Sequence, residues 1–407
     1  MTGKCVPLKM KPVAPGSGLS NSVSMKFLAR AFWLMAFVPT MAMAQSTAPV
    51  RPQTPPLLSP EVHEDRRVTF RVSATNASVV AVSGDWPGGA RPMTNDGQGV
   101  WSVTLNPLPP DVYGYSFSID GFQSLDPANS AVKPARSPRT SLLEVPGDEP
   151  ALHDFQMVPH GVVRMHEYQS RSLGKLRRLQ VYTPSGYDRN RAKFPVLYLL
   201  HGNGDTDATW VAHGRAHLIA DNLFAWGKAA SMIIVMTDGH ALPPGPRTTN
   251  AVERARAIAA FEGDLLQDVI PLVEANYRVK EGAIYRAIIG LSMGGGQSLT
   301  IGLNHPELFS WVGGMSASIF NPETSIAYAL GDAATTNRKL KLLWFACGKD
   351  DVLLKQNQHF DELLTARGIR HTFKLTEGNH SWPVWRRYLA EFLPLLFIVE
   401  PKKEKQP

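Results

Sequence analysis

The chain has 407 residues, of which 43% are hydrophobic and 19% are charged. It is therefore long enough for two or three domains with a sizeable core, and its composition is not that of a disordered protein. Five of the seven net positive charges lie in residues 1–44, which contain no acidic residue. The near-balance elsewhere argues against a nucleic-acid partner.

The first segment, residues 1–44, has the features of a leader. Lys26 and Arg30 precede a short apolar run that ends in Ala42-Met43-Ala44. A charged start, a short apolar stretch and an A-x-A site predict a secretory signal peptide, with the true start at Met25 and cleavage after Ala44. The apolar run is shorter than the roughly 20 residues of a spanning helix, so we expect no stable membrane anchor. The predicted location is secreted or periplasmic.

The next two segments are a linker and an all-β domain. Residues 45–61 are Pro-rich and polar, which predicts a linker. Residues 62–146 contain short alternating runs of β-branched and aromatic residues, separated by turn signals such as Asn95-Asp96-Gly97. This pattern predicts a small immunoglobulin-like β-sandwich over 62–146, with a Pro-containing stretch, residues 133–150, at its end. The runs are VTFRVSA, SVVAVSG, GVWSVTL and VYGYSFSID.

The largest predicted domain covers residues 158–400, where apolar strand patterns alternate with helical patterns. This alternation predicts an α/β fold with a mostly parallel sheet and helices on both faces. Strands are expected near 177–184, 194–202, 231–239, 285–292, 339–348 and 371–378. Helices are expected near 216–227, 258–277, 294–305, 355–367 and 384–398.

A candidate nucleophile lies between one of these strands and the helix that follows it. Residues 290–294 are Gly-Leu-Ser-Met-Gly, which is a G-x-S-x-G motif around Ser292. In such a strained strand-to-helix turn, glycines avoid backbone clashes and the serine hydroxyl is lifted to the carboxyl edge of the sheet. The motif alone also fits a simple tight turn, so the case for catalysis depends on finding a base and an acid.

The acid and the base are expected downstream, in the order Ser, Asp or Glu, His. One strand ends in Lys349-Asp350-Asp351, and spacing alone leaves both aspartates open; Glu377 is a weaker candidate. His380 lies in a loop at the same predicted edge of the sheet and is the expected base. The other downstream histidines are expected to be structural, and they are His305, His359 and His371.

An oxyanion formed at Ser292 needs backbone donors. One is expected to be the N–H of Met293, directly after the nucleophile. The other is expected in the loop LLHGNGD after an early strand, where glycines allow close approach and the N–H of Asn203 or a neighbour points inward. His201 is expected to hold this loop rather than to act as a second base.

Several stretches of the larger domain together resemble the esterase-D-like α/β hydrolases of carbohydrate esterase family 1, which includes feruloyl esterases and acetyl xylan esterases. The resemblance covers about residues 158–400 and implies an α/β-hydrolase fold with Ser292 as nucleophile, Asp351 as acid and His380 as base. Asn379 stands where the family often has glycine or threonine. The stretches are FPVLYLLHGNGD, FEGDLLQDVIPLVEANYRV, GLSMGGGQSLTIGLNHPELFSW, CGKDDVL and GNHSWPVWRRYLAEFLP.

The predicted sandwich resembles family 48 carbohydrate-binding modules and the N-terminal domains of isoamylase-type enzymes. The matching stretches are VTFRVSATNASVVAVSGDW, GVWSVTL, YGYSFSIDG and LDPAN. If the sandwich binds glycan, Trp86 is a candidate for stacking on sugars, because it lies in a Gly/Pro loop. Trp101 is expected to be part of the core. In the larger domain, Trp382 is a candidate wall of the substrate pocket, and Trp385 is expected to pack in its helix.

The predicted function is that of a secreted or periplasmic serine esterase acting on feruloyl or acetyl esters of xylan or its oligosaccharides. Two alternatives share the fold but differ in the ester or in the acyl acceptor: a siderophore esterase of the enterobactin type, or an acyltransferase. A third alternative is a glycan-binding protein with an inactive hydrolase domain. No metal or cofactor is expected, and the expected partner is a polysaccharide or oligosaccharide ester. The oligomeric state cannot be deduced from these patterns.

Overall fold

The computed structural model describes residues 57–243 and 250–398. The predicted leader, its start at Met25 and its cleavage site after Ala44 lie outside the described residues, as does most of the predicted linker. Within the described ranges, no helix is long and apolar enough to cross a membrane.

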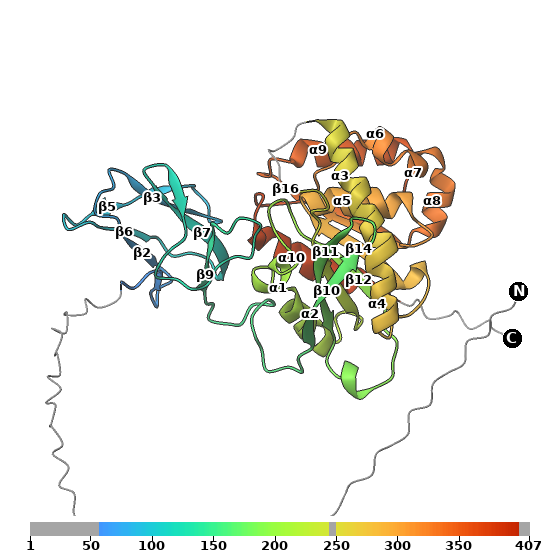
Figure 1. Ribbon diagram of the computed structural model, residues 1–407, viewed down its shortest axis with the longest axis horizontal. Coiled ribbons are helices and arrows are strands. Elements are labelled where there is room, and N and C mark those ends of the chain that lie inside the picture. The colour runs from blue at the N-terminus through green and yellow to red at the C-terminus, as the bar shows by residue number, and fades with distance from the viewer. Residues whose placement is uncertain (1–56, 244–249, 399–407) are drawn as a thin grey trace, which may run out of the picture. The chain divides into compact units, whose positions relative to one another are not determined.

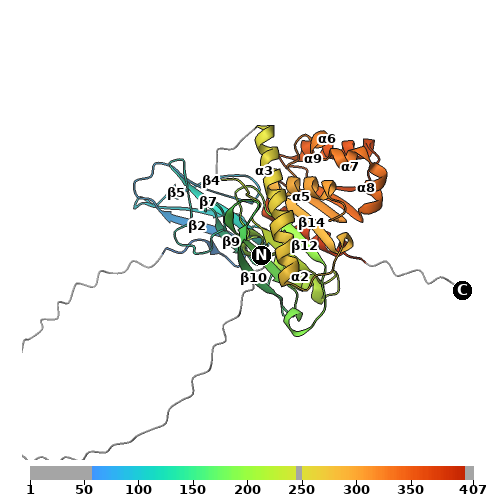
Figure 2. The same cartoon turned by 45° about the vertical axis from the view of Figure 1, so that its right-hand side comes forward.

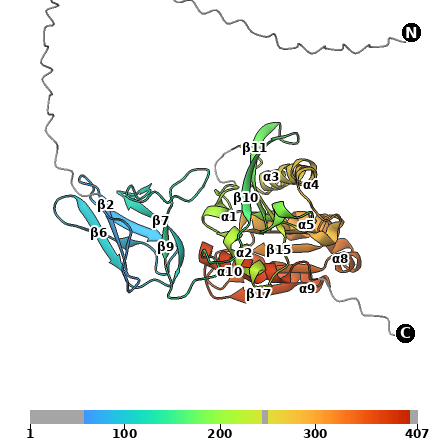
Figure 3. The ribbon, with the colours of Figure 1, turned by 90° about the horizontal axis from the view of Figure 1, so that it is seen from below.

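The N-terminal domain consists of two antiparallel sheets whose buried faces form one core (Figures 1 and 3). The first sheet has the order β1-β2-β6-β5, and the second has the order β4-β3-β7-β8 with β9 paired to β7. Alternate residues of β2, such as Phe70 and Val72, point into this core, as the alternating sequence predicts. The strands are β1 Glu61–Val62, β2 Val68–Ser73, β3 Val80–Gly84, β4 Arg91–Pro92, β5 Thr94–Asn95, β6 Val100–Leu105, β7 Asp111–Ile119, β8 Phe122–Ser124 and β9 Ser141–Val145.

Two features of the sandwich differ from expectation. The Pro-containing stretch 133–150 contains strand β9, whose backbone pairs with β7. Trp86 is only 3% exposed and packs against Phe70, with ring centroids 5.5 Å apart. Its indole occupies the space over Gly84, where an added Cβ would lie 2.2 Å from the ring. The expectation that Trp86 stacks on sugars is therefore wrong for this structure, because the ring faces are used in the core.

The second domain contains an eight-stranded sheet in the order β10-β11-β13-β12-β14-β15-β16-β17. The pairs β10–β11 and β11–β13 are antiparallel, and the remaining pairs are parallel. The predicted mostly parallel α/β-hydrolase sheet is confirmed. Its strands are β10 Val162–Ser170, β11 Lys175–Thr183, β12 Val196–Leu200, β13 Ile233–Thr237, β14 Arg286–Leu291, β15 Trp311–Met315, β16 Leu342–Gly348 and β17 Thr372–Thr376.

Helices cover both faces of this sheet and enclose two hydrophobic cores. One core contains side chains of α3, α4, α5 and α9, and the other contains side chains of α1, α2 and α10. Figure 2 shows α3 beside α5 on the first face. The α-helices are α1 Thr209–Ala212, α2 Ala216–Ala225, α3 Ala251–Asp264, α4 Ile270–Asn276, α5 Met293–Asn304, α6 Pro322–Ser325, α7 Ala327–Gly331, α8 Ala333–Lys339, α9 Leu354–Ala366 and α10 Trp382–Phe392.

Two differences from the predicted elements have a physical explanation. Strand β15 contains Gly313 and Gly314, which lower strand propensity, yet side chains of neighbouring elements fill the space beside both glycines. The helix expected at 258–277 starts earlier, at Ala251, and its N-cap is Asn250, whose side chain accepts a hydrogen bond from the N–H of Val252. Its middle, Leu265–Val269, is π-helical.

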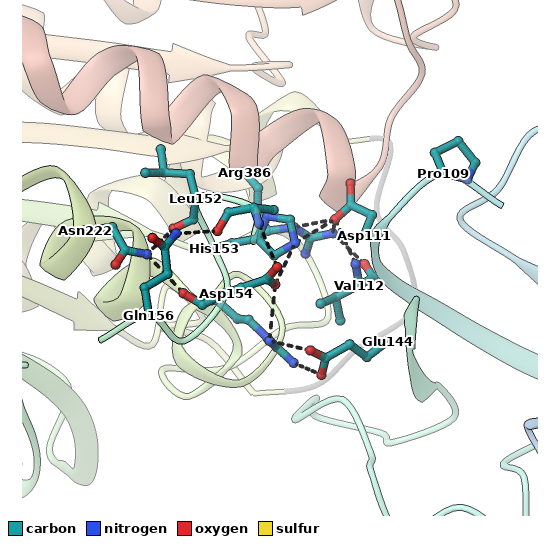
Figure 4. Close-up of polar contacts among 12 residues, drawn as sticks. Pro109, Asp111, Val112, Glu144, Leu152, His153, Asp154, Gln156, Asn222 and Arg386 are labelled. Carbon is teal, nitrogen blue, oxygen red and sulfur yellow. Dashed lines mark hydrogen bonds and ion pairs between the residues drawn. The ribbon is translucent and has the colours of Figure 1, made fainter. Parts of the chain in front are cut away.

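The two domains meet at a polar contact around Arg386 of α10 (Figure 4). The guanidinium donates from Nε and Nη2 to Oδ1 of Asp111, at 3.0 and 2.5 Å. Its Nη1 donates to the carbonyl of His213 at 2.7 Å, and Nη2 also donates to the carbonyl of Val112. The Arg386 side chain is 3% exposed. A second pair, Arg215–Glu144, joins the same domains at a more exposed position.

We expect Arg386→Met to lower the free energy of unfolding by about 3 kcal/mol, because the largely buried Asp111 carboxylate loses its arginine partner. Urea unfolding of the purified variant measures this change. Glu144→Gln is the matched control, since it removes an exposed interdomain pair and is expected to change stability by less than about 1 kcal/mol. Equal losses of unfolding free energy in the two variants would show that the buried Arg386 contact does not stabilise the protein more than the exposed pair.

Candidate active site

Ser292 lies on a strained turn between β14 and α5. Its backbone has φ 51° and ψ −115°, a conformation that non-glycine residues rarely adopt. Its N–H donates to the carbonyl of Met315 at 2.9 Å, which ties the turn to β15. A Cβ at Gly290 would lie 2.5 Å from the backbone of Gly294, and a Cβ at Gly294 would lie 2.5 Å from the carbonyl oxygen of His201. Both motif glycines are therefore required by backbone contact.

The structure brings together the three residues expected to form a triad, although they come from three different strand ends. The Oγ of Ser292 lies 3.0 Å from Nε2 of His380. The Nδ1 of His380 lies 3.0 Å from each carboxylate oxygen of Asp351. A proton on Nδ1 is then held by the carboxylate, which leaves Nε2 free to accept the serine proton. This arrangement has the order and the distances of a Ser-His-Asp triad.

The structure also distinguishes the two candidate aspartates. The side chain of Asp351 is fully buried, whereas Asp350 is exposed and its backbone N–H bonds to the carbonyl of Gly378. Burial would raise the pKa of Asp351, but hydrogen bonds from His380, Ser316 and the N–H of Leu353 outweigh it and hold the pKa below the usual range. The carboxylate therefore stays charged at neutral pH. Its contribution to stability is present above about pH 4 and is lost as pH falls through the lowered pKa.

Ser316 is a site residue that sequence reasoning missed. It follows β15, the strand that the sequence did not predict, and its backbone has φ 45°. Its hydroxyl accepts the indole N–H of Trp385 at 3.1 Å and helps to hold the pKa of Asp351 below its usual range. Prediction of β15 from the sequence would have made Ser316 a candidate, because Ser316 follows the carboxyl end of the strand that pairs with β14.

The remaining downstream candidates have other partners. His305 bonds to Glu262 and Glu307, and His371 bonds to Asp361. Further pairs join His359 to Glu323 and Lys349 to Glu377. None of these groups hydrogen-bonds to Ser292, His380 or Asp351 in the part of the chain that the structure describes.

The backbone donors expected for an oxyanion lie on both sides of Ser292. Met293 is the first residue of α5, so its N–H has no partner within the helix. In the loop after β12, the N–H of Gly204 donates to Nε2 of His240 at 3.0 Å, and the N–H of Asp205 donates to the carbonyl of Gly202 at 3.3 Å. Among the described residues, the N–H of Asn203 has no such acceptor and is available to an oxyanion.

Two histidines hold this loop from inside the domain. His201 is 1% exposed; its Nε2 accepts the N–H of Gly239, so its Nδ1 carries the proton and donates to the carbonyl of Gly202 at 2.8 Å. Burial, the largest cause, lowers the pKa of His240 to about 4. Its ring is therefore neutral at pH 7, and Nε2 can accept the hydrogen bond from the N–H of Gly204. Both rings act as supports and neither contacts Ser292.

The two tryptophans near His380 are buried. Trp382 is 3% exposed and packs edge-on against Trp210, with centroids 5.0 Å apart, and against His213. The expectation that Trp382 walls an open pocket is therefore wrong for this structure, because its ring is enclosed by other side chains. Trp385 packs against the His380 ring with a centroid distance of 4.9 Å, so it steadies the base from within α10.

Two hollows of similar size lie at different ends of the sheet of the second domain. One, of about 350 Å³, lies among residues 337–343 and 370–372, at the starts of β16 and β17 and so at the sheet edge opposite the triad. The other, of about 340 Å³, follows β15 and includes Ile319, Phe320 and His359. Only the second lies beyond the carboxyl end of a strand next to Ser292. The described residues contain no group of three or more His, Cys, Asp or Glu side chains that could hold a metal ion.

Comparison with protein families agrees with this architecture. The family described as "Putative esterase" matches residues 170–396, which is more than half of the chain. The chain belongs to this esterase family. The esterase also carries an N-terminal domain that matches "Carbohydrate-binding module 48 (Isoamylase N-terminal domain)" over residues 58–134. The resemblances drawn from the sequence are thus confirmed for both domains.

The esterase is similar to several named proteins. It is 30% identical over 350 residues to an endo-1,4-beta-xylanase/feruloyl esterase of Xylanibacter ruminicola, covering 83% of this chain and 46% of the relative. A ferulic acid esterase of Anaeromyces mucronatus shares the fold, with a TM-score of 0.52 and 24% identity over 60% of this chain and 93% of that one. The enterobactin esterase of Shigella flexneri also shares the fold. The superposition covers 81% of this chain and 92% of that one, with a TM-score of 0.60 and 18% identity. The chain spans about half the length of the curated relatives it matches.

We expect Asp351→Asn to lower kcat of the esterase by about 10⁴-fold while leaving KM nearly unchanged. An amide at this position can donate its N–H to Nδ1 of His380, which places the imidazole proton on Nε2, so Nε2 can no longer accept the proton of Ser292. Steady-state hydrolysis of 4-nitrophenyl acetate measures the change. Asp350→Asn is the matched control and should retain wild-type kcat; a similar loss in both variants would contradict the assignment of Asp351.

Proposed function

We propose that this esterase hydrolyses ester-linked feruloyl or acetyl groups on plant cell-wall polysaccharide through an acyl-enzyme formed on Ser292. The observation that carries the chemistry is the chain of hydrogen bonds from Asp351 through His380 to Ser292. The substrate class is supported by the similarity to the xylanase/feruloyl esterase, which extends over 83% of this chain and so includes both domains.

In the acylation step, Oγ of Ser292 attacks the ester carbonyl carbon while Nε2 of His380 takes the serine proton. Asp351 keeps the other proton on Nδ1 and stabilises the imidazolium that forms. The carbonyl oxygen becomes an oxyanion, to which the N–H groups of Met293 and Asn203 donate. When the tetrahedral intermediate collapses, His380 gives its proton to the departing sugar oxygen, and the acyl group remains on Ser292.

Deacylation uses the same groups in reverse roles. Water takes the place of the sugar, His380 removes its proton, and the resulting hydroxide attacks the acyl carbonyl. The second tetrahedral intermediate is held by the same two N–H groups. Its collapse returns the proton to Oγ of Ser292 and releases the carboxylic acid.

A siderophore ester is the second candidate substrate. It is favoured by one observation, the agreement in fold with the enterobactin esterase over 81% of this chain. An acyltransferase would need a sugar or lipid hydroxyl to replace water in deacylation. The assembled triad gives no support to an inactive hydrolase domain that only binds glycan.

We also propose that the protein is exported to the periplasm or beyond. The support is the charged start at Lys26 and Arg30, the short apolar run and the A-x-A sequence that ends at Ala44. Such a location agrees with a polymeric substrate that does not enter the cytoplasm. Mass measurement of the mature N-terminus tests this proposal, and an N-terminus other than Gln45 would contradict the cleavage site.

Hydrolysis of methyl ferulate, acetylated xylan, enterobactin and 4-nitrophenyl acetate should be measured with wild type and with Ser292→Ala. We expect wild type to release ferulate, and Ser292→Ala to lose about 10⁶-fold in kcat because no nucleophile remains.

The other outcomes are distinct. Release of acetate alone would assign an acetyl xylan esterase with a small acyl pocket. Release from enterobactin alone would favour the siderophore ester. If wild type and Ser292→Ala were equally inert on all four, the proposed esterase activity would be wrong.

A further inference from the structure

The end of the N-terminal sandwich reaches the loop that carries the Asn203 N–H. Residues 131–133 run beside the start of β9: Val132 forms a bridge with Ser141, and the N–H of Lys133 donates to the carbonyl of Thr140 at 2.9 Å. Since β9 pairs with β7, this segment continues the second sheet of the sandwich. It is thus anchored to the sandwich before it contacts the esterase domain.

A backbone bridge and a side-chain hydrogen bond join this segment to the loop after β12 and to the start of α1. Ala135 forms an antiparallel bridge with Asp205. The N–H of Arg136 donates to the carbonyl of Gly204 at 2.9 Å. The carbonyl of Pro134 accepts the hydroxyl of Thr209 at 2.7 Å, at the start of α1. The segment therefore supports the loop at Gly204 and Asp205, in addition to the support from His201 and His240.

A buried ion pair strengthens the contact. The Nζ of Lys133 lies 2.7 Å from Oδ1 of Asp205, and the two side chains are 19% and 5% exposed. The same ammonium lies 5.9 Å from the centre of the Trp382 ring. A carboxylate as buried as that of Asp205 is strongly destabilised without a cation, so the loop around it depends on Lys133.

Asp205 in turn fixes the direction of the Asn203 N–H. The N–H of Asp205 and the Nδ1–H of His201 both donate to the carbonyl of Gly202. This carbonyl and the Asn203 N–H belong to one peptide unit, which is planar and trans, so they point in opposite directions. Gly202 also lies directly against the nucleophile, because a Cβ added there would be 3.5 Å from Cβ of Ser292.

We propose that Lys133, contributed by the N-terminal sandwich, is a positioning residue for the oxyanion hole of the esterase domain. Through Asp205 it holds the Gly202–Asn203 peptide with its N–H toward the position of the oxyanion. The sandwich thus takes part in stabilising the transition state, in addition to any role in binding glycan. This inference rests on the proposed function, since it assigns the Asn203 N–H to the tetrahedral oxyanion.

Hydrolysis of 4-nitrophenyl acetate by the full-length chain tests the proposal, because this substrate needs no glycan contact. Lys133→Met should lower kcat by about 10- to 100-fold with KM unchanged, as expected when one oxyanion donor is displaced. Inhibition by phenylboronic acid, which forms a tetrahedral adduct on the serine, should weaken by a similar factor. Lys133→Arg keeps the charge and should restore most of the activity.

Two further variants separate positioning from folding. Asp205→Asn removes the buried charge itself, so it is expected to fold and yet to show the same loss of kcat. Glu144→Gln is the matched control, because it removes another ion pair between the same domains, with Arg215, away from this loop. It should retain wild-type kcat and boronate affinity.

The proposal would be overturned if Lys133→Met kept the wild-type kcat and boronate affinity. If Lys133→Met fails to fold, the same result in Asp205→Asn would overturn it. An equal loss in Glu144→Gln would also overturn it, because domain docking in general would then be responsible. Absence of Ser292-dependent hydrolysis in the wild type would overturn the proposed function together with this inference. Full activity of Lys133→Met beside an active wild type would overturn this inference alone.

Discussion

The chemistry of this protein depends on how closely three backbone segments approach one another at Ser292. The turn has a positive φ and is held by β15 through the carbonyl of Met315. Gly294 touches the carbonyl of His201, and Gly202 lies against Ser292 itself. Because side chains at these glycines would collide with backbone or with the core, Ser292, the loop after β12 and the start of α5 form one closely packed unit. His380 and Asp351 are then brought to this unit by two further strands.

The same unit is supported from two domains. From within the esterase domain, His201 and His240 hold the loop after β12 through Gly202 and Gly204. From the sandwich, the segment that follows its second sheet holds the same loop at Gly204 and Asp205. Arg386 joins the sandwich to α10, the helix that starts two residues after His380. An appended domain of this kind is therefore built into the framework of the active site.

Much of the fold and of the candidate site was predictable because local sequence patterns indicate it. Buried parallel strands are continuous apolar runs, so β12, β14 and β16 were found within a few residues. The turn at Ser292 has a sequence signature, since the close backbone approaches at Gly290 and Gly294 exclude any side chain at these two positions. Strand β15 escaped prediction because its two glycines have low strand propensity, and Ser316 was missed with it. Both are fixed by packing with neighbouring elements, which local sequence does not record.

The sequence by itself determined the two domain types, the Gly-Leu-Ser-Met-Gly turn and the order of Ser292, the aspartates and His380, because each depends on short-range periodicity or on motif spacing. Tertiary structure decided which aspartate the histidine contacts, since Asp350 and Asp351 differ in burial and not in sequence pattern. It also decided that Trp86 and Trp382 are enclosed, and that Lys133 meets Asp205. These outcomes depend on contacts that form only when each domain has folded, and the Lys133–Asp205 contact also requires the two domains to pack together.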